Sequence, residues 1–217
     1  VPLSLWDIDD NTQLAIIEAG ISTTGEMGNL QAMIRPTIGI ITNIGSEHND
    51  GFASMQEKAS EKCKILTSCE CIVYCADDPL VTSTIKPLLD VDVAQEIAWS
   101  RTDATRQLYV KSVAKTDKQS TLTYVYGGKQ SQLTAPFTSD RDLENVVTCL
   151  AVMLHLGIDP AVIAQRMKRL TPVGTRINVM EGVNNCTIIA DGYTSDYNSL
   201  TPALDFMFRR SSKQHDN

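Results

Sequence analysis

The stretch LAIIEAGISTTGEMGNLQAMIRPTIGIITN, residues 14–43, decides the fold class of this chain. It contains two short apolar runs, at residues 14–17 and 37–41, and such runs are typical of strands that are covered on both faces. Between them, apolar residues recur at helical spacing from Met27 until Pro36 ends the pattern. The stretch therefore predicts a strand, a helix and a second strand.

The alternation of helix and strand continues beyond this unit. Residues 54–66 are predicted as a helix, residues 71–75 as a strand, and Asp77-Asp78-Pro79 as a break. From residue 107 to residue 135 the pattern has period two around the turn signal Gly127-Gly128, which predicts an antiparallel meander. We therefore expect an α/β fold with a doubly wound, mostly parallel sheet and an attached antiparallel meander.

The rest of the chain predicts a second domain. Residues 171–174 are predicted as a linker, so we expect one domain at residues 1–172 and the start of a second α/β domain at residues 173–217. The remaining predicted elements are two helices, two strands and a last helix, at residues 144–156, 160–170, 177–180, 187–190 and 199–208.

Composition and charge exclude several classes of function. The net charge is −7 without a basic block, which argues against a nucleic-acid partner or an anionic membrane surface. No apolar run approaches the roughly 20 residues of a membrane-spanning helix, and the start of the chain lacks signal-peptide features, so we expect a cytoplasmic protein. The grouped cysteines, residues 63–75, lack the paired C-x2-C spacing of a zinc site.

Two polar clusters follow predicted strands. Glu18 comes directly after the first apolar run, and residues 43–48, ending in His48, come after the second. Ligands bind beyond the carboxyl ends of strands in open α/β sheets, so Glu18 and His48 are candidates to share a divalent cation. Mg²⁺ prefers oxygen ligands, which makes a histidine an unusual addition. The alternative is that Glu18 caps a helix and His48 faces water.

Lys62 interrupts the apolar stripe of the helix predicted at residues 54–66. It lies seven residues after Met55 and four before Leu66, with Ala59 between them. One interpretation is that its stem runs along apolar surface while the ammonium stays in water. The other is that the amine has a function.

Three motifs in order carry a family resemblance. They are AIIEAGISTTGEM at residues 15–27, ITNIGSEH at residues 41–48, and EKASEK at residues 57–62. Together they resemble the Mur ligase family, whose members use ATP to form amide bonds in peptidoglycan precursors. Gly25-Glu26-Met27 and Asn43-Ile44-Gly45 resemble the branch that adds D-alanyl-D-alanine.

The resemblance implies roles for the candidate residues. Glu18 and His48 would hold Mg²⁺ ions that bridge the ATP phosphates and the substrate carboxylate, and Asn43 would contribute to nucleotide binding. Lys62 would be the lysine that CO₂ converts to a carbamate. Partial burial lowers the pKa of an amine, which leaves a neutral fraction able to attack CO₂, and the product is an anionic oxygen ligand.

Further along, the resemblance implies contacts to the nucleotide. Asn145 retains one amide of a helix start that contacts adenine, although Glu144 and Thr148 depart from the family pattern. Arg176 resembles a hinge arginine, whose fork of donors suits phosphate oxygens. Asp191 resembles an aspartate that reaches the nucleotide when the domains close.

The parent enzyme implied by the resemblance is larger than this chain. The 217 residues contain no G-x-x-x-x-G-K-[ST] loop, which the family places upstream of Val1. We therefore expect no ligase activity from this chain alone. The parent would use ATP to join a UDP-N-acetylmuramoyl tripeptide to D-alanyl-D-alanine. Some members of this branch are fused to an alanine racemase, and residues 46–49 resemble those proteins, which leaves a downstream racemase domain open.

Two alternatives stay open at this point. Related ligases of the same fold add glutamate to folates or build amino-acid polymers, although residues 25–27 and 43–45 argue against that substrate class. The missing loop is what a non-catalytic domain that binds nucleotide or a partner would show. Glu18, His48 and Lys62 together argue for an enzyme.

Overall fold

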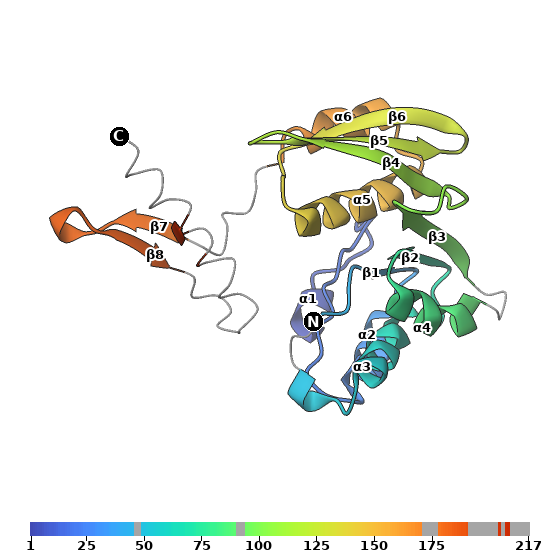
Figure 1. Cartoon of the computed structure of the whole chain (residues 1–217). Coiled ribbons are helices and arrows are strands. Elements are labelled where there is room, and N and C mark those ends of the chain that lie inside the picture. Colours follow the sequence, from blue (N-terminus) through green and yellow to red (C-terminus); the bar gives the residue numbers. More distant parts are fainter. Residues whose placement is uncertain (46–48, 90–93, 171–177, 191–203, 205–206, 209–217) are drawn as a thin grey trace. The chain divides into compact units, whose positions relative to one another are not determined.

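The computed structural model describes residues 1–45, 49–89, 94–170, 178–190, 204 and 207–208 (Figure 1). The chain divides into two compact units, Val1–Leu170 and Thr171–Asn217. The first unit contains a six-stranded sheet, and the second contains a two-stranded sheet.

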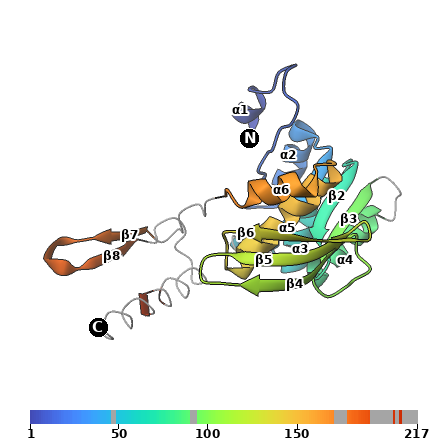
Figure 2. The same cartoon turned by 90° about the horizontal axis from the view of Figure 1, so that it is seen from above.

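The six-stranded sheet has the order β1-β2-β3-β4-β5-β6. Its strands are β1 (Ile38–Ile41), β2 (Cys71–Cys75), β3 (Gln95–Ser100), β4 (Leu108–Lys115), β5 (Ser120–Tyr126) and β6 (Lys129–Ala135). Neighbours from β1 to β4 run parallel, whereas β4, β5 and β6 pair antiparallel and lie side by side in Figure 2. The predicted α/β class, with a mostly parallel sheet and an antiparallel meander, is confirmed.

Strand β2 is buried on both faces, which explains its continuous apolar sequence. Cys71 and Val73 pack into the core on one face, together with residues of α5 (Asp140–His155). Ile72 and Tyr74 pack into the core on the other face, together with residues of α3 (Met55–Cys63) and α4 (Pro79–Leu89). Successive side chains of a strand point to opposite faces, so a strand between two helical layers must be apolar throughout.

Helices cover both faces of the parallel strands (Figure 1). Their bounds, with those of the short 3-10 segments, are α1 (Pro2–Leu5), α2 (Glu26–Ile34), η1 (Asn49–Gly51), α3 (Met55–Cys63), η2 (Lys64–Leu66), α4 (Pro79–Leu89), α5 (Asp140–His155) and α6 (Pro160–Met167). None of the helices in the described part of the chain is long and apolar enough to cross a membrane.

The strand predicted at residues 14–17 is wrong. The segment has no regular secondary structure, and its apolar side chains are open to solvent, with Leu14 61% and Ile16 86% exposed. An isolated strand is not stable, because its backbone groups and apolar face need a neighbour. β1 is the end strand of the sheet and pairs with β2, and no described strand pairs with residues 14–17.

Four elements were not predicted, namely α1, η1, α4 and β3, and one helix begins earlier than predicted. α4 and β3 fill the region between β2 and the meander. α5 begins at Asp140 instead of residue 144, because the Ser139 hydroxyl accepts a hydrogen bond from the Asp142 N–H and caps the first turn.

The second unit contains an antiparallel pair, β7 (Asn178–Glu181) and β8 (Thr187–Ala190), joined through η3 (Val183–Asn185). Within that turn Asn184 has φ 57°, the left-handed region that asparagine tolerates better than most residues. The two predicted strands are confirmed. Most of the helix predicted at residues 199–208 lies outside the described residues.

Candidate functional site

Three segments singled out in the sequence, around Glu18, Asn43 and Lys62, meet at α3. The first contact joins η1 to the segment that follows Glu18, because a Cβ built on Gly51 would lie 1.9 Å from the Ser22 carbonyl oxygen. No side chain fits in that space without moving the backbone. The chain that follows β1 therefore packs directly against the chain that follows Glu18.

The second contact joins α3 to the start of α2 through Glu61. Its side chain is 1% exposed, and Oε1 accepts hydrogen bonds from the Gly25 N–H at 2.7 Å and the Met27 N–H at 3.2 Å. The first N–H groups of a helix lack partners within it, and Gly25, the N-cap of α2, has no side chain to supply one. Glu61 therefore caps α2 from another helix, where a negative charge also suits the helix dipole.

Glu61 is charged although it is buried. Burial by itself would raise the pKa of its carboxyl group. The hydrogen bond from Lys64 Nζ, at 2.5 Å, and those from the two backbone amides outweigh burial and lower this pKa below its usual value. The charge of Lys64, whose side chain is half exposed, compensates that of the carboxylate.

The third contact joins α3 to the loop after β1 through Lys58. This residue is 1% exposed, and its Nζ donates a hydrogen bond to the Gly45 carbonyl oxygen at 2.6 Å. The same Nζ lies 6.0 Å from the centre of the Phe52 ring, whose face attracts a cation. A buried ammonium requires such partners, so Lys58 fixes the loop to the helix.

We call this set of contacts the α3 junction; its residues are Ser22, Gly25, Met27, Gly45, Gly51, Phe52, Lys58 and Glu61.

The segments joined at the junction contain three of the predicted site residues. Glu18 is exposed, Asn43 is half-buried two residues after β1, and Lys62 is half-buried in the last turn of α3. Their segments come together, but no hydrogen bond joins these three described side chains to one another. The predictions for His48, Arg176 and Asp191 lie outside the described residues.

The sequence analysis missed Lys58 and Glu61. Both lie on the same helix as Lys62. Lys58 is three residues before Glu61 and four before Lys62, which places its side chain next to each of them on the helix surface. This spacing is the signal that was available. The apolar stripe predicted for the helix is confirmed at Ala59 and Leu66, which are both buried.

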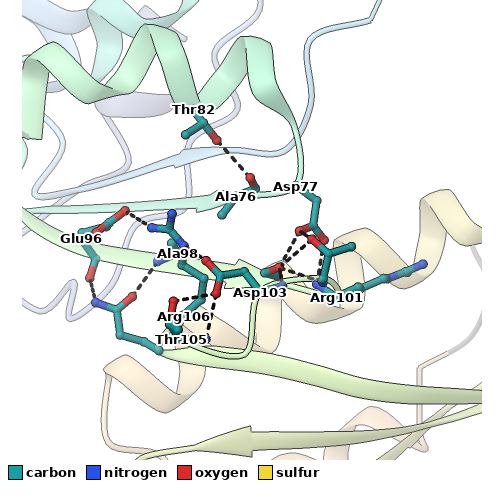
Figure 3. Close-up of polar contacts among 12 residues, drawn as sticks. Ala76, Asp77, Thr82, Glu96, Ala98, Arg101, Asp103, Thr105 and Arg106 are labelled. Carbon is teal, nitrogen blue, oxygen red and sulfur yellow. Dashed lines mark hydrogen bonds and ion pairs between the residues drawn. The ribbon is translucent and has the colours of Figure 1, made fainter.

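A second polar cluster lies at the carboxyl ends of β2 and β3 (Figure 3). The Asp77 carboxylate accepts hydrogen bonds from the Ser100 hydroxyl at 2.5 Å, the Thr102 hydroxyl at 2.6 Å and the Arg101 N–H at 2.7 Å. Burial would raise the pKa of Asp77, but these bonds outweigh it and lower the pKa. The cluster fixes the turn that leaves β3.

Arg101 extends from this cluster toward the start of α5. Its Nη1 lies 3.4 Å from the Asp140 carboxylate, which also accepts a hydrogen bond from Lys115 Nζ at 2.9 Å. Nε and Nη2 of Arg101 are buried and have no hydrogen-bond partner among the described residues. Asn145, the predicted adenine contact, lies exposed on the second turn of α5.

Thr148, which departs from the family pattern, has a structural role. It is buried, its hydroxyl oxygen accepts a hydrogen bond from the Trp99 indole N–H at 3.1 Å, and it donates to the Glu144 carbonyl at 2.9 Å. Trp99 is one of the largest fully buried side chains. Thr148 therefore satisfies the one polar atom of that side chain and faces the core, away from solvent.

The donor chemistry near the α3 junction suits Mg²⁺. Glu18 offers an exposed carboxylate, and a carbamate on Lys62 would offer a second anionic group, both with the oxygen donors that Mg²⁺ prefers. No cluster of three or more histidine, cysteine, aspartate or glutamate side chains occurs in the described part of the chain.

Comparison with known proteins identifies the family of this chain. Residues 1–153 match the Mur ligase middle domain. The chain is 23% identical over 207 residues to the UDP-N-acetylmuramoyl-tripeptide--D-alanyl-D-alanine ligase of Bacillus subtilis (strain 168), covering 94% of this chain and 43% of that protein. It is 26% identical over 192 residues to the UDP-N-acetylmuramate--L-alanine ligase of Synechococcus sp. (strain JA-3-3Ab), covering 87% of this chain and 36% of that protein.

Among solved structures, MurF from Acinetobacter baumannii superposes with a TM-score of 0.76 at 17% identity. The superposition covers 92% of this chain and 43% of that chain. A likeness at this identity shows the fold. The chain thus spans less than half the length of the relatives it matches.

Proposed function

This chain belongs to the Mur ligase family, and from that premise we propose that the protein containing it is an ATP-dependent ligase of peptidoglycan precursor synthesis. Its substrates would be a UDP-N-acetylmuramoyl tripeptide and D-alanyl-D-alanine, as the name of the Bacillus subtilis relative suggests. The observation that carries the proposal is the α3 junction, because it draws together the three segments that contain Glu18, Asn43 and Lys62.

The reaction has two steps. An oxygen of the terminal carboxylate attacks the γ-phosphorus of ATP, the bond to the β-phosphate oxygen breaks, and ADP leaves. The dipeptide amine then attacks the carbonyl carbon of the acyl phosphate, the bond to the phosphate oxygen breaks, and the amine loses its proton. In phosphoryl transfers of this kind, catalysis is mostly positioning and neutralisation of charge.

Glu18, His48 and Lys62 are the residues we propose for that positioning. When bound, Mg²⁺ would neutralise phosphate charge and orient the reacting oxygens. Glu18 would hold it through an exposed carboxylate. Lys62 would contribute after its neutral amine attacks CO₂ and loses a proton to give the carbamate. Half-burial of Lys62 suits this step, since the amine remains accessible to CO₂.

The nucleotide would lie across the carboxyl ends of the parallel strands, where ligands bind in open α/β sheets. Asn145 is the proposed contact to adenine, and its exposure on α5 makes it available. Asn43 is proposed to bind nucleotide from the loop after β1. Arg176 and Asp191, in the second domain that would begin at residue 173, are proposed to bind the nucleotide as well.

Mass spectrometry of the coupled product tests the substrates directly. The full-length protein, ATP, Mg²⁺ and the UDP-muramoyl tripeptide would be incubated with D-alanyl-D-alanine, L-alanine or glutamate in parallel. We expect one product, heavier than the tripeptide precursor by the dipeptide less one water. A product with another amino acid would reassign the substrate within the family, and no product with any acceptor would favour a non-catalytic domain.

A further inference from the structure

We propose that Lys58 is a positioning residue of the ligase site, which fixes Gly45 and Phe52 to α3 next to Lys62 and so supports metal binding there. The proposal rests on the function inferred above. Lys58 is distinct from Lys62, the residue proposed to carry the carbamate, and nothing in the family resemblance assigns it a role.

Burial is the first argument for such a role. A lysine ammonium is costly to remove from water unless its donors find partners, so a buried lysine with no task would be replaced without loss by an apolar side chain of similar length. Lys58 is 1% exposed, yet it retains its hydrogen bond to the Gly45 carbonyl at 2.6 Å. The Lys58 side chain therefore fixes the Gly45 carbonyl to α3 and does more than fill space in the core.

The second argument is which parts of the loop Lys58 contacts. Gly45 precedes residues 46–48 in the chain, and Phe52 follows them shortly after. The Nζ of Lys58 contacts both, through the Gly45 carbonyl and the Phe52 ring. One side chain thus holds both Gly45 and Phe52 against α3.

The third argument is the place of Lys58 relative to Lys62. Residues four apart on a helix lie next to each other, with Cβ atoms roughly 5–6 Å apart. Because Lys58 and Lys62 share α3, Gly45 and Phe52, which the first contacts, are fixed to the helix that carries the second. Glu61, on the same helix, holds the segment after Glu18 through Gly25 in the same way. α3 is thus the common frame of all three proposed metal-binding segments.

The test compares three lysine variants of the full-length protein in ATP-dependent phosphate release at varied Mg²⁺. Lys58→Met keeps the length of the side chain without a donor, Lys58→Arg keeps a donor, and Lys86→Met is the control on the exposed face of α4. We expect Lys58→Met to raise the half-saturating Mg²⁺ concentration about tenfold, as for outer-shell partners of metal ligands. Lys58→Arg should raise it less than threefold, and Lys86→Met should not change it.

Several results would overturn the proposal. These are a half-saturating Mg²⁺ concentration in Lys58→Met within twofold of wild type, or equal shifts in the Met and Arg variants. Should Lys58→Met not fold, the Arg variant decides alone, and a tenfold shift there contradicts the role assigned to the donor.

If wild type releases no phosphate, the proposed function fails, and Lys58 is then judged separately. Electron paramagnetic resonance can measure Mn²⁺ binding to the same proteins in the presence of ATP. This measurement does not require the enzyme to turn over. Weaker Mn²⁺ binding by Lys58→Met than by Lys86→Met supports the role. Equal binding, or no binding by wild type, contradicts it.

Discussion

Gly51 and Glu61 act at the scale of single residues, and both join segments that are distant in the sequence. Gly51 lets the chain after β1 approach the Ser22 carbonyl, and Glu61 caps α2 from α3. Neither contact was predictable from local sequence. Whether a glutamate is buried, or whether a position requires glycine, depends on which distant segment packs against that residue in the folded chain. Lys62 could be singled out from the sequence, since it interrupts the apolar stripe between Met55 and Leu66, and its role stays a prediction.

Gly51→Ala should destabilise the protein by about 2 kcal/mol, the usual range for inserting a methyl group where neighbours cannot move freely. The new Cβ would meet backbone, the Ser22 carbonyl oxygen, which cannot rotate away. Urea titration gives the free energy of unfolding. Gly20→Ala is the matched control, because nothing lies within 4 Å of a Cβ there. Equal unfolding free energies for the two variants would show that Gly51 is not tightly packed.

Glu61→Gln should lower stability by about 2 kcal/mol at pH 7, since hydrogen bonds to a charged acceptor are stronger than those to an amide. The pKa of Glu61 is lowered in the folded state, so its ionised form stabilises the fold above the unfolded pKa. That stabilisation is lost as pH falls from about 4.5 through the folded pKa. The difference between wild type and variant, from urea titrations at several pH values, should therefore shrink below pH 4.5. A constant difference from pH 7 to pH 3 would contradict a charged Glu61.

At the scale of elements, sequence patterns predicted the helices and strands whose apolar residues recur at regular spacing and are buried. The buried strand β2, the meander β4 to β6 and the helix α2 all follow from periodicity. The strand at residues 14–17 was wrong because pattern alone does not say whether a partner strand is present. α4 was missed because Pro87 and the polar run Thr82-Ser83-Thr84 are unusual within a helix, so its stability comes from packing of residues such as Ile85.

α5 carries two polar residues with opposite tasks, and they can be separated by mutation. Thr148→Val removes the acceptor for the Trp99 indole and should cost about 1–2 kcal/mol of stability, with ATP affinity unchanged. Asn145→Ala changes an exposed residue and should leave stability within about 0.5 kcal/mol while it weakens ATP binding. Thermal unfolding and calorimetric ATP titration measure the two effects. Loss of ATP binding in Thr148→Val at unchanged stability would reverse the assignment.

At the scale of the whole molecule, the chain spans less than half the length of the relatives it matches. It spans 43% of the Bacillus subtilis relative, and the reaction proposed here needs a phosphate-binding loop that these 217 residues do not contain. The first unit contributes the α3 junction and the exposed face of α5. The family resemblance was readable from three ordered motifs, whereas the contacts that join those motifs required the structure.

The central claim is that the segments gathered at α3 form one ATP-dependent ligase site. Phosphate release by the full-length protein, with ATP, Mg²⁺, the UDP-muramoyl tripeptide and D-alanyl-D-alanine each omitted in turn, tests it most directly when repeated with Lys62→Ala and Lys86→Ala. We predict that phosphate release requires every component and persists in Lys86→Ala. In Lys62→Ala it should fall at least a hundredfold, because several kcal/mol of charge stabilisation would be lost. Release that ignores the dipeptide, or that survives in Lys62→Ala, would contradict the account.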